Sequence, residues 1–351
     1  MSTLLFHAVL VITEFILFRL VRKSTLWKTI VRLVGGVGFV AGSAGFLLTV
    51  LAGYGFFGVL RLWAWAVFLH GPVLLILIAR LRGGTHRWLR VVSPSLSILI
   101  VGIAVYAFQI EPRWLEVSRV TIESPKITEP VRLVLLADVQ TDRVGDYERR
   151  VLETALAERP DAILFAGDYI QGTGDVLRKQ WKVLADLLEE VELAAPLGVY
   201  AVRGNCDPQG WESVFERIDA NLFGSTATAK LGELTLTGLS MEDSFRPQLR
   251  VSAESEFHIV LGHAPDFALG QIEADLLLAG HCHGGQVRIP FLGPPITLSK
   301  VPRAWAAGMT ELRPEVNLIV SRGIGLERAA APRFRFLCRP EIVVIDLVPK
   351  L

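Results

Sequence analysis

Gly280-His281-Cys282-His283-Gly284-Gly285-Gln286 is the stretch from which the fold of this chain can be predicted. It directly follows the apolar run from Leu276 to Ala279, which predicts a short buried strand. Two of the chain's seven histidines stand one residue apart there, and the flanking glycines let the backbone bend tightly. Two histidines placed in this way at a strand end can face two neighbouring metal ions. The stretch therefore predicts a metal site at the end of a strand.

Four other apolar runs end in a similar way. They are Leu133 to Ala137, Ala162 to Ala166, Val199 to Val202 and Ile259 to Leu261, and they lead to Asp138-Val139-Gln140, Gly167-Asp168, Gly204-Asn205-Cys206-Asp207 and Gly262-His263. Any one of these ends is most simply a turn or the start of a loop. Together with the histidine stretch, they make five such ends in one chain. This number indicates a shared site, because open α/β sheets place their sites beyond the carboxyl ends of the strands.

The segments between these runs predict the fold class. Runs that are apolar on both faces suit sheet strands covered on both sides. The amphipathic stretches 146–158 and 176–193 are typical of the crossover helices of βαβ units. We therefore expect an α/β domain that begins with a strand from Trp114 to Ile122.

The residue types at the strand ends also favour a particular chemistry. Asp, Asn and His supply ligands for Mn²⁺, Zn²⁺, Fe or Mg²⁺. One central carboxylate can bridge two ions a few ångströms apart. Such a pair of ions generates a hydroxide at neutral pH. It also stabilises both the entering and the leaving oxygen of an in-line displacement.

With these residues, the chain from about Trp114 to its end resembles the calcineurin-like metallophosphoesterases. The family pattern is Asp-x-His, Gly-Asp, Gly-Asn-His-Asp/Glu, His and Gly-His-x-His. The sequence looks most like the bacterial branch in which the catalytic domain follows a signal peptide or membrane helices. That resemblance includes Gly280 to Gln286, Ser321-Arg322-Gly323-Ile324-Gly325 and the closing segment 335–342. It implies a four-layer α/β/β/α sandwich with two central sheets and a site for two divalent metal ions, with Mn²⁺ expected first.

The resemblance also assigns roles to single residues. Asp168 would bridge both metals and would act through the bridging hydroxide. The expected ligands of one ion are Asp138, His283 and Gln140; those of the other are Asn205, His263 and His281. The expected catalytic residues are Asp168, Asn205, Cys206 and His263.

Two positions depart from the family pattern. Gln140 stands where the family has a histidine, so a carbonyl oxygen replaces an imidazole, which favours Mn²⁺ or Mg²⁺. Cys206 stands where the family has the histidine near the leaving group, which favours a substrate with a good leaving group or another proton donor. A nucleophilic role for Cys206 or Cys282 is disfavoured, and a disulfide between them is an alternative if the domain lies outside the cytoplasm.

The first third of the chain has the composition of a membrane region. Overall, 51% of the residues are hydrophobic and the mean hydropathy is +0.44. Charge-free runs extend from Leu33 to Leu60, Leu62 to Ala79 and Val91 to Ile110, and Leu4 to Leu20 is a weaker fourth. We expect about four transmembrane helices in residues 1–112 and a catalytic domain in 113–351. Three helices, or a cleaved signal peptide at the N-terminus, are the alternatives.

Charge predicts the orientation of these helices. Residues 1–112 contain ten Lys and Arg and two acids, which leaves 26 and 33 for residues 113–351. Clusters at 19–32 and 80–90 predict cytoplasmic loops, and Arg61 marks the opposite loop, so the catalytic domain is expected outside the cytoplasm. An acidic catalytic domain argues against nucleic acid as a partner.

Several polar and small residues bear on the role of the membrane region. Glu14 and His70 have no obvious partner in the sequence, which argues against a transporter. Gly38, Gly42 and Gly45 favour packing within the helix bundle, with a homodimer through the membrane helices as the alternative.

These observations together predict a multi-pass protein of the cell membrane. Its expected activity is metal-dependent hydrolysis of a phosphodiester, phosphomonoester or pyrophosphate in a small molecule or a lipid-linked or envelope substrate. The expected partners are therefore the lipid bilayer and that substrate. The alternatives are a degenerate domain that acts as a membrane-tethered binding module, and a hydrolase of the UDP-diacylglucosamine pyrophosphate type.

Overall fold

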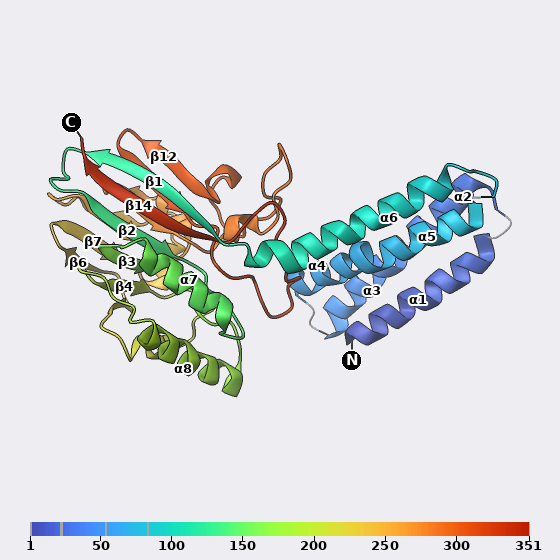
Figure 1. The fold of residues 1–351 in the computed structure, drawn as a ribbon, viewed down its shortest axis with the longest axis horizontal. Helices are drawn as coiled ribbons and strands as arrows, with labels where there is room; N and C mark the ends of the chain where they lie inside the picture. Colours follow the sequence, from blue (N-terminus) through green and yellow to red (C-terminus); the bar gives the residue numbers. More distant parts are fainter. Residues whose placement is uncertain (1, 22–23, 53–54, 83, 351) are drawn as a thin grey trace. The chain divides into compact units, whose positions relative to one another are not determined.

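The computed structural model describes all residues except 1, 22–23, 53–54, 83 and 351. The chain divides into two compact units (Figure 1). The first comprises residues 1–109 and 329–333, and the second comprises 110–328 and 334–351.

The first unit is helical. Its helices pack on a small apolar core that includes Leu10, Leu33 and Leu62. A methyl group added at Gly42 or Gly45 would lie 3.7 Å from Trp63 or 3.9 Å from Val59, so these glycines face a neighbouring helix of the same chain. The helices are α1 (Ser2–Val21), α2 (Leu26–Ile30), η1 (Val31–Gly35), α3 (Gly36–Ala52), α4 (Phe56–Trp65), η2 (Ala66–His70), α5 (Gly71–Arg82), α6 (Leu89–Val105) and η3 (Tyr106–Ile110).

Two helical stretches among the described residues are long and apolar enough to cross a membrane. They are Phe56–Arg82, with 27 residues, and Leu89–Arg113, with 25 residues. Of the roughly four transmembrane helices predicted, two are thus supported. The charge-free run from Leu33 to Leu60 is divided between α3 and α4, and Arg61 lies within α4 rather than in a loop. A count of charges cannot detect such a break, because the residues around it are apolar on both sides.

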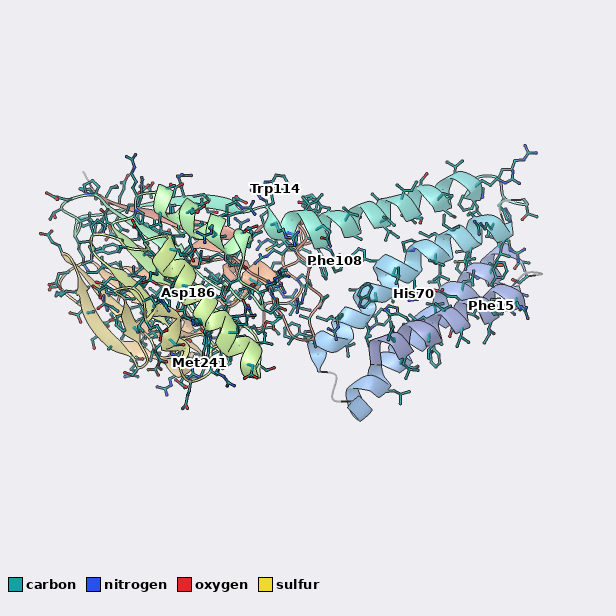
Figure 2. The ribbon with its side chains drawn as sticks, turned by 60° about the horizontal axis from the view of Figure 1, so that its bottom comes forward. Phe15, His70, Phe108, Trp114, Asp186 and Met241 are labelled. Carbon is teal, nitrogen blue, oxygen red and sulfur yellow. The ribbon has the colours of Figure 1, made fainter. Side chains whose placement is uncertain are left out.

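Two ionisable side chains that lacked an obvious partner in the sequence contact each other. Nδ1 of His70 lies 2.8 Å from Oε1 of Glu14, and both side chains are buried. The other ring nitrogen of His70 lies 3.1 Å from Nδ1 of His7 (His70 is labelled in Figure 2). The contact joins α1 to η2, since Glu14 and His7 are both on α1. The two groups therefore form a pair that is not visible in the sequence, because residues 56 positions apart meet in the bundle.

The second unit contains two six-stranded sheets (Figure 1). The first sheet has the order β1-β14-β2-β3-β4-β5, and the second has the order β12-β13-β11-β9-β7-β6. The strands of the first sheet are β1 (Glu116–Ser124), β2 (Val131–Leu136), β3 (Ala162–Phe165), β4 (Val199–Val202), β5 (Asn221–Phe223) and β14 (Glu341–Pro349). Those of the second are β6 (Ala227–Leu231), β7 (Leu234–Gly238), β9 (His258–Leu261), β11 (Leu276–Ala279), β12 (Gly308–Arg313) and β13 (Val316–Val320). A separate pair joins β8 (Arg250–Val251) and β10 (Gln271–Ile272).

One apolar core lies between the two sheets. Leu133 and Leu164 of the first sheet and Ile259 and Leu278 of the second are fully buried in it. The outer face of the first sheet packs against α7 (Asp146–Ala157) and α8 (Gly174–Glu190), which confirms both predicted crossover helices. Three layers of the predicted α/β/β/α sandwich are therefore present.

The fourth layer differs from the expectation. The outer face of the second sheet is covered by short helical turns and loops, among them η6 (Pro265–Leu269) and η8 (Arg303–Trp305). Phe267 and Trp305 pack there against Val260 and Leu277 of the sheet. Long helices do not form on this side, because the connections around the second sheet contain short runs with frequent Gly and Pro.

Candidate active site

The candidate site lies where neighbouring strands end. β2, β3 and β4 are adjacent and parallel in the first sheet, so the residues that follow them share one edge. β9 and β11 are adjacent and parallel in the second sheet and carry the histidine segments. The alternation of strands and crossover helices thus collects residues that are up to 145 positions apart, from Asp138 to His283.

Three of the predicted metal ligands form one buried cluster. Asp138, Asp168 and His263 each offer a ligand atom, and these atoms lie within 4.8 Å of one another. Nδ1 of His263 is 3.9 Å from Oδ1 of Asp138, and Nε2 is 3.5 Å from Oδ2 of Asp168. All three side chains are almost fully buried.

The ring of His263 is fixed by a backbone carbonyl. Nδ1 lies 2.7 Å from the carbonyl oxygen of Ala166, and only a protonated nitrogen can donate to that oxygen. Burial lowers the pKa of His263 to about 4, so the ring is neutral at pH 7 and Nε2 carries a lone pair. Nε2 lies 2.9 Å from Oδ1 of Asn205, in addition to its approach to Asp168. Three electron-rich atoms therefore converge, an arrangement that a bound cation would stabilise.

The pKa values of four other predicted ligands, two acids and two histidines, are all shifted so that the neutral form is favoured. Burial raises the pKa of Asp168 to about 6 and raises that of Asp138 well above its usual value, with the charge of Asp168 adding to the effect on Asp138. Burial also lowers the pKa of His281 to about 4 and that of His283 well below its usual value. Imidazoles bind divalent cations in their neutral form, and here they lie beside crowded carboxylates that can bind the same cations.

Backbone strain is concentrated at the same residues. Five of the predicted metal ligands have positive φ: Asp138 (50°), Gln140 (29°), Asp168 (58°), His281 (66°) and His283 (47°). Non-glycine residues seldom adopt this region, and such residues cluster at functional sites. All five residues lie just beyond the ends of β2, β3 and β11.

Glycines let the site loops approach one another. A methyl group added at Gly204 would lie 2.2 Å from Oδ1 of Asp168, and one at Gly280 would lie 2.9 Å from Oδ2 of Asp138. One at Gly323, which has a φ of 70°, would lie 2.8 Å from Cβ of Asp138 and 3.2 Å from Nδ1 of His283. These positions tolerate only glycine, so the glycines beside the predicted ligands are part of the site's construction.

Gln140 presents a free oxygen. Its amide nitrogen donates to Oε2 of Glu327 at 3.2 Å and to Oε1 of Gln171 at 3.1 Å. The carboxylate of Glu327 requires a donor, and this sets the orientation of the amide. Oε1 of Gln140 is buried and has no hydrogen-bond partner among the described residues, which suits a ligand oxygen.

The two remaining histidines occupy different environments. The ring of His281 lies edge-on to Phe245 and 5.1 Å from the ring of His263, and Nε2 lies 3.3 Å from the carbonyl oxygen of Leu298. His283 is buried, and its Nδ1 has no hydrogen-bond partner in the part of the chain that the structure describes.

The cysteines are all free. The backbone N–H of Cys206 donates to Oδ1 of Asp168 at 2.7 Å, and burial raises the pKa of its thiol far above the usual range. Cys282 is buried among apolar residues on the second sheet, where burial raises its pKa to about 12. Neither thiol suits a nucleophile, and the alternative of a disulfide between them is not realised.

Two important residues were missed by reasoning from the sequence. Asp207 is buried, and its carboxylate accepts the backbone N–H groups of Asp168, Tyr169 and Gly204 at 2.7 to 2.9 Å. Arg335 is fully buried and donates to the carbonyls of Arg322, Gly323 and Gly325. Asp207 was visible as a carboxylate beside Asn205, but nothing in the sequence showed which backbone groups Arg335 would bind.

Gln286 braces the loop that holds the paired histidines. Its Oε1 accepts the backbone N–H of Glu327 at 3.2 Å. This contact links the histidine loop to the segment that orients Gln140.

The chain is similar to several known proteins. Residues 131–285 match the family model described as calcineurin-like phosphoesterase. The chain is 29% identical over 262 residues to the uncharacterized metallophosphoesterase YkuE of Bacillus subtilis, covering 69% of this chain and 88% of that protein. It is 27% identical over 260 residues to the phosphodiesterase YaeI of Escherichia coli, covering 69% and 92%. A metallophosphoesterase of Aquifex aeolicus is 28% identical over 267 residues, covering 69% and 95%.

Proposed function

Because this chain belongs to the calcineurin-like phosphoesterase family and is a phosphoester hydrolase, we propose that it is a membrane-anchored phosphodiesterase that uses two divalent metal ions. In this proposal a helical region, residues 1–112, anchors a catalytic domain, residues 113–351. The substrate is a phosphodiester or pyrophosphate of a lipid-linked or envelope compound. The observation that carries the proposal is the convergence of Nε2 of His263, Oδ1 of Asn205 and Oδ2 of Asp168.

The donor set fits two cations. We assign Asp138, His283 and Gln140 to one ion, Asn205, His263 and His281 to the other, and Asp168 to both. Two buried atoms in this set, Oε1 of Gln140 and Nδ1 of His283, lack a hydrogen-bond partner within the described ranges of the chain. Bound divalent ions would supply Lewis-acid activation of water and neutralisation of the phosphate charge. Carboxylate and amide oxygens beside imidazoles favour Mn²⁺, with Zn²⁺, Fe or Mg²⁺ as alternatives.

The chain's own residues prepare this chemistry. The Ala166 carbonyl keeps the lone pair of His263 on Nε2, and the N–H of Cys206 holds the carboxylate of Asp168 in place. The resemblance places Cys206 near the leaving group. A thiol of raised pKa is a poor proton donor, so we propose substrates whose leaving group departs without strong acid assistance.

Metal dependence tests the proposal. The full-length protein, depleted with EDTA and assayed on bis(p-nitrophenyl) phosphate, is expected to gain at least about tenfold in rate when Mn²⁺ is restored. Its thermal midpoint is expected to rise by roughly 5–10 °C, because the ions bind only the folded cluster. Full activity in EDTA, or no activity with any of Mn²⁺, Zn²⁺, Fe²⁺ and Mg²⁺, would show that the assignment is wrong.

We further propose that the catalytic domain lies outside the cytoplasm. The stretches Phe56–Arg82 and Leu89–Arg113 would form a hairpin, and the basic residues near their shared loop are Arg80, Arg82, Arg87 and Arg90. A basic loop on the cytoplasmic side places the end of the second stretch, and hence the catalytic domain, on the other side. This orientation disfavours UDP-diacylglucosamine, which lies on the cytoplasmic side, as the substrate.

Protease accessibility tests the orientation. In spheroplasts, proteinase K added outside is expected to degrade the catalytic domain while a cytoplasmic marker protein stays intact. Protection of the domain until the membrane is lysed would place it in the cytoplasm. A second protein with a known external domain serves as the control for protease activity.

A further inference from the structure

The segment after the paired histidines forms a hairpin that the hydrolytic chemistry does not use. The backbone N–H of Ile289 donates to the carbonyl of Gly293 at 3.0 Å, and that of Gly293 donates to Ile289 at 2.9 Å. This tight turn presents Phe291 and Leu292 at its tip. Phe291 is fully exposed, and Leu292 is 64% exposed. Ile289 and Leu298 are also exposed, and we call Ile289, Phe291, Leu292 and Leu298 the apolar wedge.

The backbone of the wedge is strained. Phe291 has a φ of 66° and Leu298 a φ of 54°. Large side chains rarely adopt this conformation, and it persists only where the surrounding structure enforces it. Exposed aromatic and aliphatic side chains gain nothing from folding, so this strain is not offset by burial within the domain. Both features indicate that these side chains contact something outside the domain.

The base of the hairpin is fixed to the candidate active site. Carboxylate Oδ1 of the buried Asp266 accepts the backbone N–H of Lys300 at 2.9 Å and the hydroxyl of Ser299. The carbonyl oxygen of Leu298 lies 3.3 Å from Nε2 of His281. A methyl group at Gly285 would collide with Pro294, so the two strands of the loop are closely packed there. Leu298 of the wedge therefore lies beside His281, a predicted metal ligand.

The segment that carries the wedge has a net charge opposite in sign to that of the domain as a whole. Residues 276–310 contain no Asp or Glu, although residues 113–351 as a whole contain 33. The same segment carries Arg288, Lys300 and Arg303, and the last two are exposed. Apolar side chains with a basic rim match the interface of a bilayer with anionic headgroups. A narrow convex tip of this kind offers little area to a protein partner, which needs a broad complementary surface.

We propose that the apolar wedge inserts into the surface of the lipid bilayer and brings phosphoesters with long alkyl chains to the metal cluster. The two stretches that can span a membrane belong to the same chain, so a bilayer is the partner that the wedge would meet. The proposed insertion is argued from the exposure, the backbone strain and the charge of the loop. The choice of a lipid phosphoester as substrate also rests on the proposed function.

The first test measures insertion without catalysis. The full-length protein with Phe291→Cys is labelled with the fluorophore NBD and reconstituted into vesicles of phosphatidylcholine and phosphatidylglycerol. Lipids that carry a doxyl quencher near the headgroup are expected to quench this probe at least about twofold more than a probe at Val176→Cys. Val176, a control position on α8 far from the hairpin in sequence, is 56% exposed. The unsubstituted protein, treated in the same way, gives the background from native cysteines. Equal quenching at the two positions would overturn the proposal.

The second test measures selectivity. Hexadecyl p-nitrophenyl phosphate and methyl p-nitrophenyl phosphate share a leaving group and differ in the alkyl chain. The double substitution Phe291→Ser and Leu292→Ser is expected to raise KM for the hexadecyl ester by about tenfold while kcat for the methyl ester stays unchanged. Val176→Ser is the matched control. An unchanged KM for the hexadecyl ester would contradict delivery by the wedge. If the wild-type protein hydrolyses neither ester, the proposed function fails, and the quenching result alone decides insertion.

Discussion

Asp168→Asn is expected to reduce hydrolysis of bis(p-nitrophenyl) phosphate roughly a thousandfold or more, because several kcal/mol of charge stabilisation depends on the cations that Asp168 would hold. The substitution preserves size and shape. The amide oxygen can still accept the N–H of Cys206, which lies 2.7 Å from Oδ1 in the wild-type protein. The loss is therefore attributed to the negative charge and not to a collapsed loop.

The same substitution has an opposite effect on the metal-free protein. The pKa of Asp168, raised to about 6, means that its ionised form is disfavoured in the fold compared with the unfolded chain. Stability from a group of raised pKa is lost as the pH rises through that value, so at pH 7.5 the charge is a cost. We therefore expect Asp168→Asn to unfold in EDTA at the same temperature as the wild-type protein or a higher one. Added Mn²⁺ should no longer raise its thermal midpoint.

Asp175→Asn is the matched control, because Asp175 is an exposed residue of α8 that pairs with Arg178 on the same helix. It should match the wild-type protein in rate and in its response to Mn²⁺. Retained activity in Asp168→Asn would show that the Asp168 carboxylate is not needed for the reaction. A large fall in the thermal midpoint in EDTA would instead show that Asp168 supports the fold.

Gly204→Ala is expected to lower the hydrolysis rate on the order of a hundredfold, since displacements of about 1 Å at a reacting centre have that effect. The added methyl group would lie 2.2 Å from Oδ1 and 2.4 Å from the backbone nitrogen of Asp168. Neither atom can move freely, because the nitrogen donates to Asp207 and Oδ1 accepts from Cys206. The loop must shift, and the thermal midpoint should fall by about 5–10 °C from the strain.

Gly224→Ala provides the comparison. A methyl group there would approach only the end of the Glu212 side chain, at 3.9 Å. It should leave both the rate and the thermal midpoint nearly unchanged. If Gly204→Ala behaves like Gly224→Ala, the close packing of the two site loops is not required for activity.

Much of the site could be predicted because strands carry a strong local signal. The runs before Asp138, Asp168 and Asn205 are long enough, and sufficiently apolar throughout, to be identified as strands. Parallel strands place their carboxyl ends together. The helices α7 and α8 followed from amphipathic periodicity in the same way.

The parts that escaped prediction depend on contacts between distant residues or on breaks without a polar signal. The insertion of β14 between β1 and β2 joins the end of the chain to the start of the domain, and no local pattern encodes it. Asp207 and Arg335 act on backbone groups, whose positions follow from the fold and not from residue type. The division between α3 and α4 lies within an apolar run, so the absence of charge predicts one helix where the structure has two.

The metal content of the full-length protein tests the central claim most directly. After equilibration with Mn²⁺ and removal of free metal, the wild-type protein and Asp175→Asn should each contain two metal ions per chain by plasma mass spectrometry. Asp168→Asn should contain less than one, because the two assigned ligand sets share that carboxylate. Fewer than one ion in the wild-type protein, or an unchanged content in Asp168→Asn, would contradict the account.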